Sequence, residues 1–259
     1  MKNSIAIDIN ADMGESFGRW VLGNDAALMP HVTSANIACG FHAGDPHIMR
    51  ECVRLAKLHG VGVGAHVGFL DLMGFGRRRI DLTPAQLRDH VIYQVGALMG
   101  FALAEGVRVE HVKPHSALYK LCMENADYAE ALASALKELD SNLILVSSGE
   151  IAEWAASRVG LQYVGEGFID LEYDEAGAYV PEWPKRSWPP QQVAERALIL
   201  ARERTITLRN GSRVAIRADS TCIHGDADNA AEIAQAVRAR LAQNDIEVVP
   251  LRRILERRA

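Results

Sequence analysis

Short runs rich in β-branched residues alternate with longer helix-like segments along almost the whole chain. We predict strands at, or within, Ser4–Ile9, Val32–Ala38, Val61–His66, Val109–Val112, Leu143–Val146, Gln162–Glu166, Val214–Ile223 and Ile246–Pro250. We predict helices at Pro46–His59, Pro84–Glu105, Asn125–Leu139, Glu150–Val159, Pro190–Arg204 and Asp226–Asn244. Strand–helix alternation at this spacing indicates a mainly parallel α/β sheet, either open or closed into a barrel.

The chain length of 259 residues fits one α/β barrel, and no linker divides it. We therefore predict a single catalytic domain over 1–259. Proline and tryptophan gather at about 167–190, where Trp183 and Trp188 stand among four prolines. A linker would explain the prolines, but two tryptophans favour a lid or a partner-facing loop.

Charge and composition argue against a nucleic-acid-binding protein, a membrane protein and a domain stabilised by disulfides or zinc. The formal net charge is −5, which gives no electrostatic support for binding nucleic acid or an anionic membrane. No apolar stretch approaches the ~20 residues that cross a bilayer, and no signal peptide is recognised, so a cytoplasmic location is expected. The four cysteines are scattered without a CxxC pair, which argues against a structural zinc site and a disulfide framework.

Polar and ionisable residues concentrate where the predicted strands end. In chain order they are Asp8, Asn10, Asp12, Glu15, Asn36, His42, Asp45, His66, Arg77, Lys113, His115, Ser147, Ser148, Glu166, Asp170, His224 and Asp226. The strand starts, by contrast, carry apolar residues such as Ile5, Val61, Val109, Leu143 and Val214. Because parallel α/β folds bind ligands at the carboxyl edge of the sheet, this pattern predicts an enzyme with one concave site and favours a closed barrel.

Some of these residues also have structural explanations. Asp8, Asn10 and Asp12 alternate, so they share one face of a strand; if that face is inward, each needs a polar partner. Asp12, before Met-Gly, also suits a turn cap. Asp45 precedes Pro46 and is as well explained by capping the next helix as by function. His42 lacks such an explanation.

A fourth-strand motif places a lysine in the predicted barrel interior. His111 and Lys113 share a face, and Pro114 is expected to end pairing and release His115 into a loop. Burial would lower the pKa of Lys113, whereas Asp8 or Asp12 would hold it up. Buried lysines are rarely structural, so we interpret Lys113 as functional.

Read in order, these clusters resemble the LamB/YcsF family, the A subunit of bacterial 5-oxoprolinase. The similar stretches are Asp8-Ile-Asn-Ala-Asp-Met-Gly-Glu15, Ser34-Ala-Asn-Ile-Ala-Cys-Gly-Phe-His-Ala-Gly-Asp45, Gly64-Ala-His66, Gly74-Phe-Gly-Arg77, His111-Val-Lys-Pro-His115 with Leu118-Tyr119, and Ile223-His-Gly-Asp226. They span almost the whole chain.

The resemblance implies a (β/α)7-type barrel like those of glycoside hydrolases and deacetylases. It also implies ATP-dependent ring opening of 5-oxoproline, or a related lactam, to glutamate. Two partner subunits would phosphorylate the lactam and bind most of the ATP, and this subunit would complete ring opening. A homo-oligomer is compatible with this assembly.

The family chemistry suggests roles for the strand-end residues. Asp8 or Asp12 would orient or deprotonate water, His42 or His66 would shuttle a proton, and Lys113 and Arg77 would pair with anions. The expected catalytic residues are Asp8, Asp12, His42, His66, Lys113 and His115. The expected substrate-binding residues are Asn10, Asn36, Asp45, Arg77, Glu166, Asp170, His224 and Asp226. No metal is firmly predicted.

The sequence also departs from the family pattern. Phe168-Ile-Asp-Leu-Glu-Tyr173 places Leu171 where an arginine is usual, with no neighbouring lysine to replace it. The later proline–arginine–serine stretch is lengthened and rich in tryptophan, Ser116 replaces a glycine, and Val67 replaces a proline. These changes suggest a paralogue whose lactam differs from 5-oxoproline.

Two other functions remain open on the sequence. A metal-dependent amide hydrolase or deacetylase could gather a divalent ion with Asp8, His42, His66 and His224, although no HxxxH or HxxEH motif supports it. A non-catalytic binding subunit is suggested by the partner-dependent chemistry and the tryptophan-rich segment.

Overall fold

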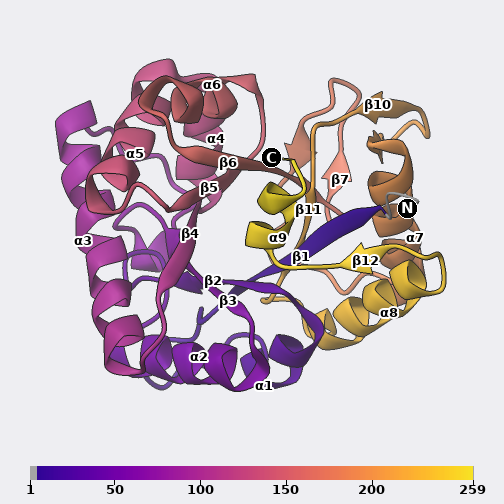
Figure 1. The fold of residues 1–259 in the computed structure, drawn as a ribbon, viewed down its shortest axis with the longest axis horizontal. Coiled ribbons are helices and arrows are strands. Elements are labelled where there is room, and N and C mark those ends of the chain that lie inside the picture. The colour runs from indigo at the N-terminus through magenta and orange to yellow at the C-terminus, as the bar shows by residue number, and fades with distance from the viewer. Residues whose placement is uncertain (1–4, 259) are drawn as a thin grey trace.

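Seven parallel strands close into a barrel in the computed structural model, which describes residues 5–258. The barrel strands are β1 Ala6–Met13, β2 Ser34–Ala38, β3 Gly62–Val67, β4 Val109–Pro114, β5 Ile144–Ser147, β6 Gln162–Phe168 and β11 Ser220–His224. They pair in that order, and β11 pairs with β1 to close the ring (Figure 1). The predicted (β/α)7 barrel is confirmed. Ser4, in the first predicted strand, lies outside the described residues.

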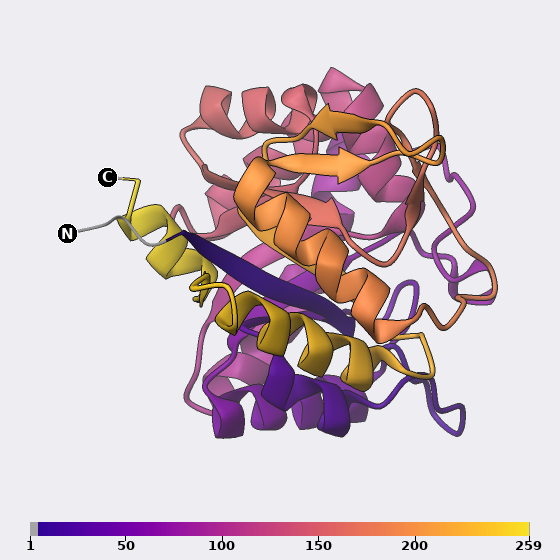
Figure 2. The ribbon, with the colours of Figure 1, turned by 90° about the vertical axis from the view of Figure 1, so that its right-hand side faces the viewer.

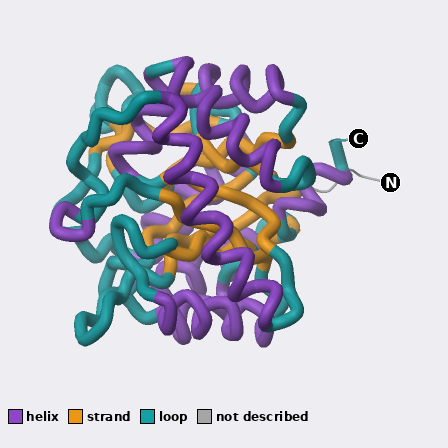
Figure 3. Tube along the Cα trace, turned by 90° about the vertical axis from the view of Figure 1, so that its left-hand side faces the viewer, coloured by secondary structure: helices purple, strands orange, loops and turns teal. Residues whose placement is uncertain are grey.

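Helices surround the strands on the outside (Figure 3). They are α1 Asp25–Leu28, α2 Pro46–His59, α3 Pro84–Ala104, α4 Ser116–Glu124, α5 Ala126–Leu139, α6 Glu150–Val159, α7 Pro190–Glu203, α8 Ala230–Ala242 and α9 Leu251–Glu256, with the short 3₁₀ helices η1 Met29–His31 and η2 Leu72–Gly74. Thr83 and Gln86 form a capping box at the start of α3.

The apolar core lies between the barrel and the helices. Ile9 and Val112, on outward faces of β1 and β4, join one cluster with Val95 and Leu98 of α3, and all four are fully buried. Burying a side chain of this size contributes about 1.5–3 kcal/mol. With the apolar faces of the strands committed outward, the barrel interior is left to the polar faces.

Three sequence predictions need correction outside the barrel. Val214 lies on β10 Arg213–Ala215, which pairs with β9 Thr205–Thr207 in a small antiparallel ribbon beside α7 (Figure 2). The barrel strand of that region is β11 alone. Helix α4 was not predicted, and α8 begins after the turn that holds Asp226. The last predicted strand is reduced to β12 Glu247–Val248, paired with the start of β1.

Pro114 does not end strand pairing as predicted. It pairs with Val67 of β3, and the amide of His115 donates to the Val67 carbonyl at 2.8 Å. Backbone amides alternate sides along a strand, so the missing N–H of Pro114 faces β5. Pairing with β5 stops at Val112, so no donor is needed there.

The segment at 167–190 folds onto the barrel and is not a linker. It contains the antiparallel pair β7 Glu172–Tyr173 and β8 Tyr179–Val180. Trp188 is buried, and its carbonyl accepts from the side chain of Asn229, whereas Trp183 is 68 % exposed. Within the described residues, no helix has the length and apolar character that crossing a membrane requires.

Candidate active site

The inward faces of the strands form stacked polar layers inside the barrel. In the deepest layer, Asp8 accepts from the hydroxyls of Thr33, Ser34 and Ser220 at 2.8, 2.7 and 2.5 Å. Burial raises the pKa of Asp8 to about 6, against the opposing effect of these hydrogen bonds. Asp8 is therefore fully partnered below the cavity and does not line it.

The middle layer links four strands through amide and imidazole groups. Asn36 donates to Asn10 Oδ1 at 2.7 Å, and Asn10 donates to Glu166 Oε2 at 3.1 Å. His111 Nε2 lies 2.8 Å from Asn36 Oδ1, and its ring occupies space that a side chain at Gly64 would fill. This layer supports the groups above it and positions them across the barrel.

In the upper layer, Lys113 Nζ donates to Asp12 Oδ1 at 2.8 Å and lies 3.3 Å from Glu166 Oε2. Burial alone would lower the pKa of Lys113, but the carboxylates of Asp12 and Glu166 raise it well above its usual value. Burial would likewise raise the pKa of Asp12, but His66 and Lys113 hold it well below its usual range. Both groups are therefore charged.

A second ion pair lies beside the first. His224 Nδ1 is 2.9 Å from Asp170 Oδ1, and the other Asp170 oxygen accepts from the His224 amide. Burial would lower the pKa of His224, but Asp170 raises it above its usual value. The imidazole is thus held as a proton donor, with Nε2 3.9 Å from Asp12 Oδ2.

Lys185 brings a cation to the position that the sequence left without one. Its Nζ is 3.6 Å from Asp170 Oδ2 and donates to the Asp170 carbonyl, next to Leu171. No lysine adjoins Leu171 in the sequence, but Lys185 approaches it in the structure because the 167–190 segment folds back. The sequence did not predict Lys185 as a site residue; its only distinguishing feature was its position in that segment.

Arg77 lies at the cavity wall. Its guanidinium donates to the Glu182 carbonyl, lies 3.5 Å from Asp226 Oδ2, and stacks 4.7 Å from the Trp183 ring centroid. Arg77 thus connects the loop after β3 with the 167–190 segment. Asp226 serves as its counter-ion.

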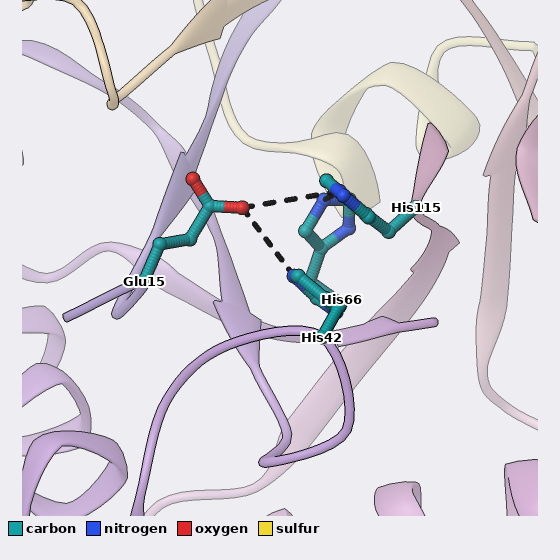
Figure 4. Close-up of side chains that lie close together, drawn as sticks. All are labelled: Glu15, His42, His66 and His115. Carbon is teal, nitrogen blue, oxygen red and sulfur yellow. Dashed lines mark hydrogen bonds and ion pairs between the residues drawn. The ribbon is translucent and has the colours of Figure 1, made fainter. Parts of the chain in front are cut away.

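Three histidines and a glutamate meet at one side of the barrel mouth (Figure 4). Glu15 Oε1 lies 3.3 Å from His42 Nε2 and 3.8 Å from His115 Nδ1, and His66 Nε2 lies 3.0 Å from His115 Nδ1. Burial and His66 lower the pKa of His42 well below its usual value. Burial, with His42 and His66, does the same for His115. These four residues have the donor atoms for a metal ion.

A narrow cavity of about 50 Å³ opens above these layers. Its lining combines residues from the barrel and from the 167–190 segment, namely Asp12, His66, Arg77, Lys113, Pro114, His115, Ser116, Tyr119, Phe168, Leu171, Tyr179, Pro181, Glu182, Lys185 and His224. The segment therefore covers the mouth of the barrel, as a lid would.

Most of the predicted site residues come together here, and a few do not. Asp12, His66, Arg77, Lys113, His115 and His224 line the cavity. Asn10, Asn36, His42, Glu166, Asp170 and Asp226 contact these residues from behind. Asp45 lies apart, because its carboxylate caps α2 by accepting from the amides of His47 and Ile48.

The metal set considered from the sequence does not assemble. His42 and His66 lie together, but Asp8 is in the deepest layer and His224 pairs with Asp170. Their places are taken by Glu15 and His115. The strand-end pattern contained both residues, but it did not show which of them converge.

Comparisons with known proteins match this architecture. The model of the LamB/YcsF family matches residues 7–256. The 5-oxoprolinase A subunit of Pyrococcus abyssi is 44 % identical over 95 % of this chain and 98 % of its own length. The corresponding protein of Nocardia farcinica is 46 % identical over 93 % and 98 %. The crystal structure of the lactam utilization protein of Thermus thermophilus superposes with a TM-score of 0.87 at 44 % identity, covering 95 % of this chain and 100 % of that one. The chain described here belongs to the LamB/YcsF family.

Proposed function

We propose that this chain is the A subunit of an ATP-dependent 5-oxoprolinase and opens the ring of 5-oxoproline, or a related lactam, to give glutamate. The names of its relatives support the substrate class. The observation that carries the proposal is one cavity holding a permanent carboxylate, Asp12, a permanent ammonium, Lys113, and a proton donor, His224.

A lactam is a resonance-stabilised amide, so its carbonyl carbon is a poor electrophile. Phosphorylation of the lactam oxygen by the partner subunits would make that carbon reactive. Water then adds its oxygen to the carbon, and the ring C–N bond breaks as the nitrogen takes up the protons that the water releases, which leaves an acyl phosphate. A second water cleaves this acyl phosphate to give glutamate and inorganic phosphate. Asp12 is suited to orient the first water, because its low pKa keeps it an acceptor.

His224 is the better candidate for the proton that the leaving nitrogen requires. It lines the cavity, and Asp170 raises its pKa above the usual value, which favours the protonated imidazole. Of the two histidines expected from the sequence to shuttle a proton, His42 is fully buried and does not line the cavity, whereas His66 lines it. In our proposal His224 takes the donor role, because Asp170 raises its pKa.

The anionic parts of the substrate require cations. Lys113 at the base of the cavity suits the developing charge on the lactam oxygen or its phosphate. Lys185 and Arg77, at the wall, suit a carboxylate or phosphate. Lys185 thus places a positive charge next to Leu171, where the family has an arginine. With this charge present, 5-oxoproline remains a suitable substrate for the site.

Two partner subunits complete the proposed enzyme and hold most of the ATP. The exposed Trp183 stacks on Arg77, so a partner that touched this tryptophan would also contact the cavity wall. The 167–190 segment would in that case be both the lid and part of the interface.

The test is glutamate release from 5-oxoproline by the chain together with its two partner subunits, with and without ATP. We expect ATP-dependent release that is lost in Lys113→Ala and retained in Lys120→Ala, which removes an exposed lysine of α4. An intact assembly that releases no glutamate would exclude 5-oxoproline, and other lactams would then be screened. Full activity of Lys113→Ala would instead favour a non-catalytic role for this chain.

A further inference from the structure

We infer that Glu15, His42, His66 and His115 form a binding site for one divalent transition-metal ion of the zinc type. The four residues follow, or end, the consecutive strands β1, β2, β3 and β4. One ligand atom from each lies within 4.8 Å of all the others, and all four residues are buried (Figure 4). Tetrahedral zinc sites use imidazole nitrogens and carboxylate oxygens in this way.

Backbone carbonyls fix the tautomers of two of the histidines. His66 Nδ1 lies 3.0 Å from the Lys113 carbonyl, and His115 Nε2 lies 2.8 Å from the Phe75 carbonyl. Because a carbonyl oxygen only accepts, each of these nitrogens carries the proton. This carbonyl-to-imidazole arrangement is the usual outer support of metal-binding histidines.

The remaining nitrogens of the two rings then present lone pairs to each other. His66 Nε2 and His115 Nδ1 are 3.0 Å apart. Two bare lone pairs at this distance repel, so the pair needs a cation between or beside them. The cation is either a proton, which makes one ring an imidazolium and would also face Asp12 Oδ2, 3.4 Å from His66 Nε2, or a metal ion.

Two further ligands point at the same place without a hydrogen-bond partner. Both ring nitrogens of His42 and Oε1 of Glu15 are buried, and none of these three atoms makes a hydrogen bond within the described part of the chain. Unpartnered buried polar groups are rare and costly. A shared proton between His66 and His115 leaves all three atoms unpartnered, whereas a metal ion at the centre would bind Glu15 Oε1 and one ring nitrogen of His42.

The rings are held in position by close packing. His42 and His115 stack with centroids 3.8 Å apart and planes 6° from parallel. A side chain at Gly68 would meet the His42 ring at 2.7 Å, and one at Gly76 would meet His42 Cβ and the His115 ring. The glycines thus leave room for the imidazoles. Such pre-organisation favours a ligand that needs fixed geometry.

The donor set also selects the class of ion. Three imidazoles and one carboxylate suit Zn²⁺, Co²⁺ or Ni²⁺ better than Mg²⁺ or Ca²⁺, which prefer oxygen ligands. A second group, Asp12, Cys222 and His224, is already occupied, because Lys113 Nζ lies 2.8 Å from Asp12 and 2.9 Å from Cys222 Sγ. The proposed metal site is therefore the group of Glu15, His42, His66 and His115.

The test uses the full-length chain, stripped with a chelator and titrated with Zn²⁺ by calorimetry. We expect one ion per chain. His42→Gln and Glu15→Gln should each weaken binding at least about ten-fold, the loss already typical of removing an outer partner of a ligand. His47→Gln, an exposed histidine of α2, should bind as the wild type does. Circular dichroism checks that each variant is folded.

Co²⁺ gives a second readout that does not depend on affinity. The wild-type chain should give the intense visible absorption of a four-coordinate ion, and His42→Gln should lose it. If the wild type binds Zn²⁺ no more tightly than a folded His42→Gln variant, or if Co²⁺ keeps the spectrum of the aqua ion, a shared proton occupies the cluster and the inference fails. Neither measurement uses lactam turnover, so the proposed function is tested separately.

Discussion

Lys113 is a buried charge, and its neighbours determine how it affects the free energy of unfolding. Asp12 and Glu166 lie within 3.3 Å of its ammonium, so removing the lysine would leave two buried carboxylates without this counter-charge. We expect Lys113→Met to lower the free energy of unfolding by about 3–5 kcal/mol. Adding Asp12→Asn should recover part of this loss, as urea unfolding of the single and double variants would measure. Strictly additive losses would contradict the coupling.

Asp8 predicts a pH dependence of stability with a defined sign. Its pKa is about 6 in the folded chain against 3.8 as the ordinary value, so the folded state binds the proton more tightly. Stability is therefore lost as the pH rises from 3.8 through 6, by about 3 kcal/mol for this group.

The variant Asp8→Asn removes this titration. Relative to the wild type, its free energy of unfolding should improve between about pH 4 and about pH 8. Urea unfolding across this range measures the difference. Parallel curves for the two proteins would show that Asp8 does not titrate in this window. A constant offset is expected in any case, because asparagine cannot accept all three hydroxyl hydrogen bonds of Asp8.

Asp170 should control the pH profile of the proposed reaction. Burial alone would lower the pKa of His224, and Asp170 is what raises it. Asp170→Asn should therefore move the basic limb of the kcat profile to lower pH, because His224 then loses its proton earlier. The variant would lose more activity at about pH 8 than at about pH 6. An unshifted limb, with kcat merely scaled, would argue against His224 as the proton donor.

At the level of elements, sequence signals succeeded where one local rule determined the structure. The predicted bounds of α2 and α6 are those observed, since Pro46 starts α2 and Gly60 and Gly160 end the two helices in left-handed conformations. Helix α4 lacked such a signal. It follows His115 without a side-chain cap, and Ser116 adopts a φ of 40°.

Asp45 can be assigned at this level, because it caps α2. Asp45→Ala should lower the free energy of unfolding by about 1 kcal/mol, and Asp45→Ser, which keeps a capping oxygen, should lose less. Neither variant should change KM for the lactam, because Asp45 lies outside the cavity lining. Thermal unfolding and steady-state kinetics check both expectations; a raised KM in both variants would return Asp45 to the substrate site.

At the level of the whole molecule, the strand-end pattern predicted the barrel and the edge that holds the site. It could do so because alternation puts Asp8, Asn10 and Asp12 on one face, and parallel strands end together. It could not show that Asp8 lies two layers below the cavity. Nor could it place Lys185 and Glu15, because their positions depend on how loops fold back across the barrel mouth.

The inferred metal site should stabilise one half of that mouth. Its ligands come from the ends of β1 to β4, and at about 100 times Kd a bound ion stabilises the chain by about 2.7 kcal/mol. Hydrogen exchange with and without Zn²⁺ measures where this stabilisation acts. We expect slower exchange around 14–18, 39–45, 66–76 and 113–118, and little change at the ends of β6 and β11. Metal binding slows exchange only where local opening separates the ligands, because an opening that leaves the ligands in place does not release the ion. His42→Gln is the control and should show no such protection. Protection spread evenly over the barrel, or concentrated at β6 and β11, would place the ion elsewhere.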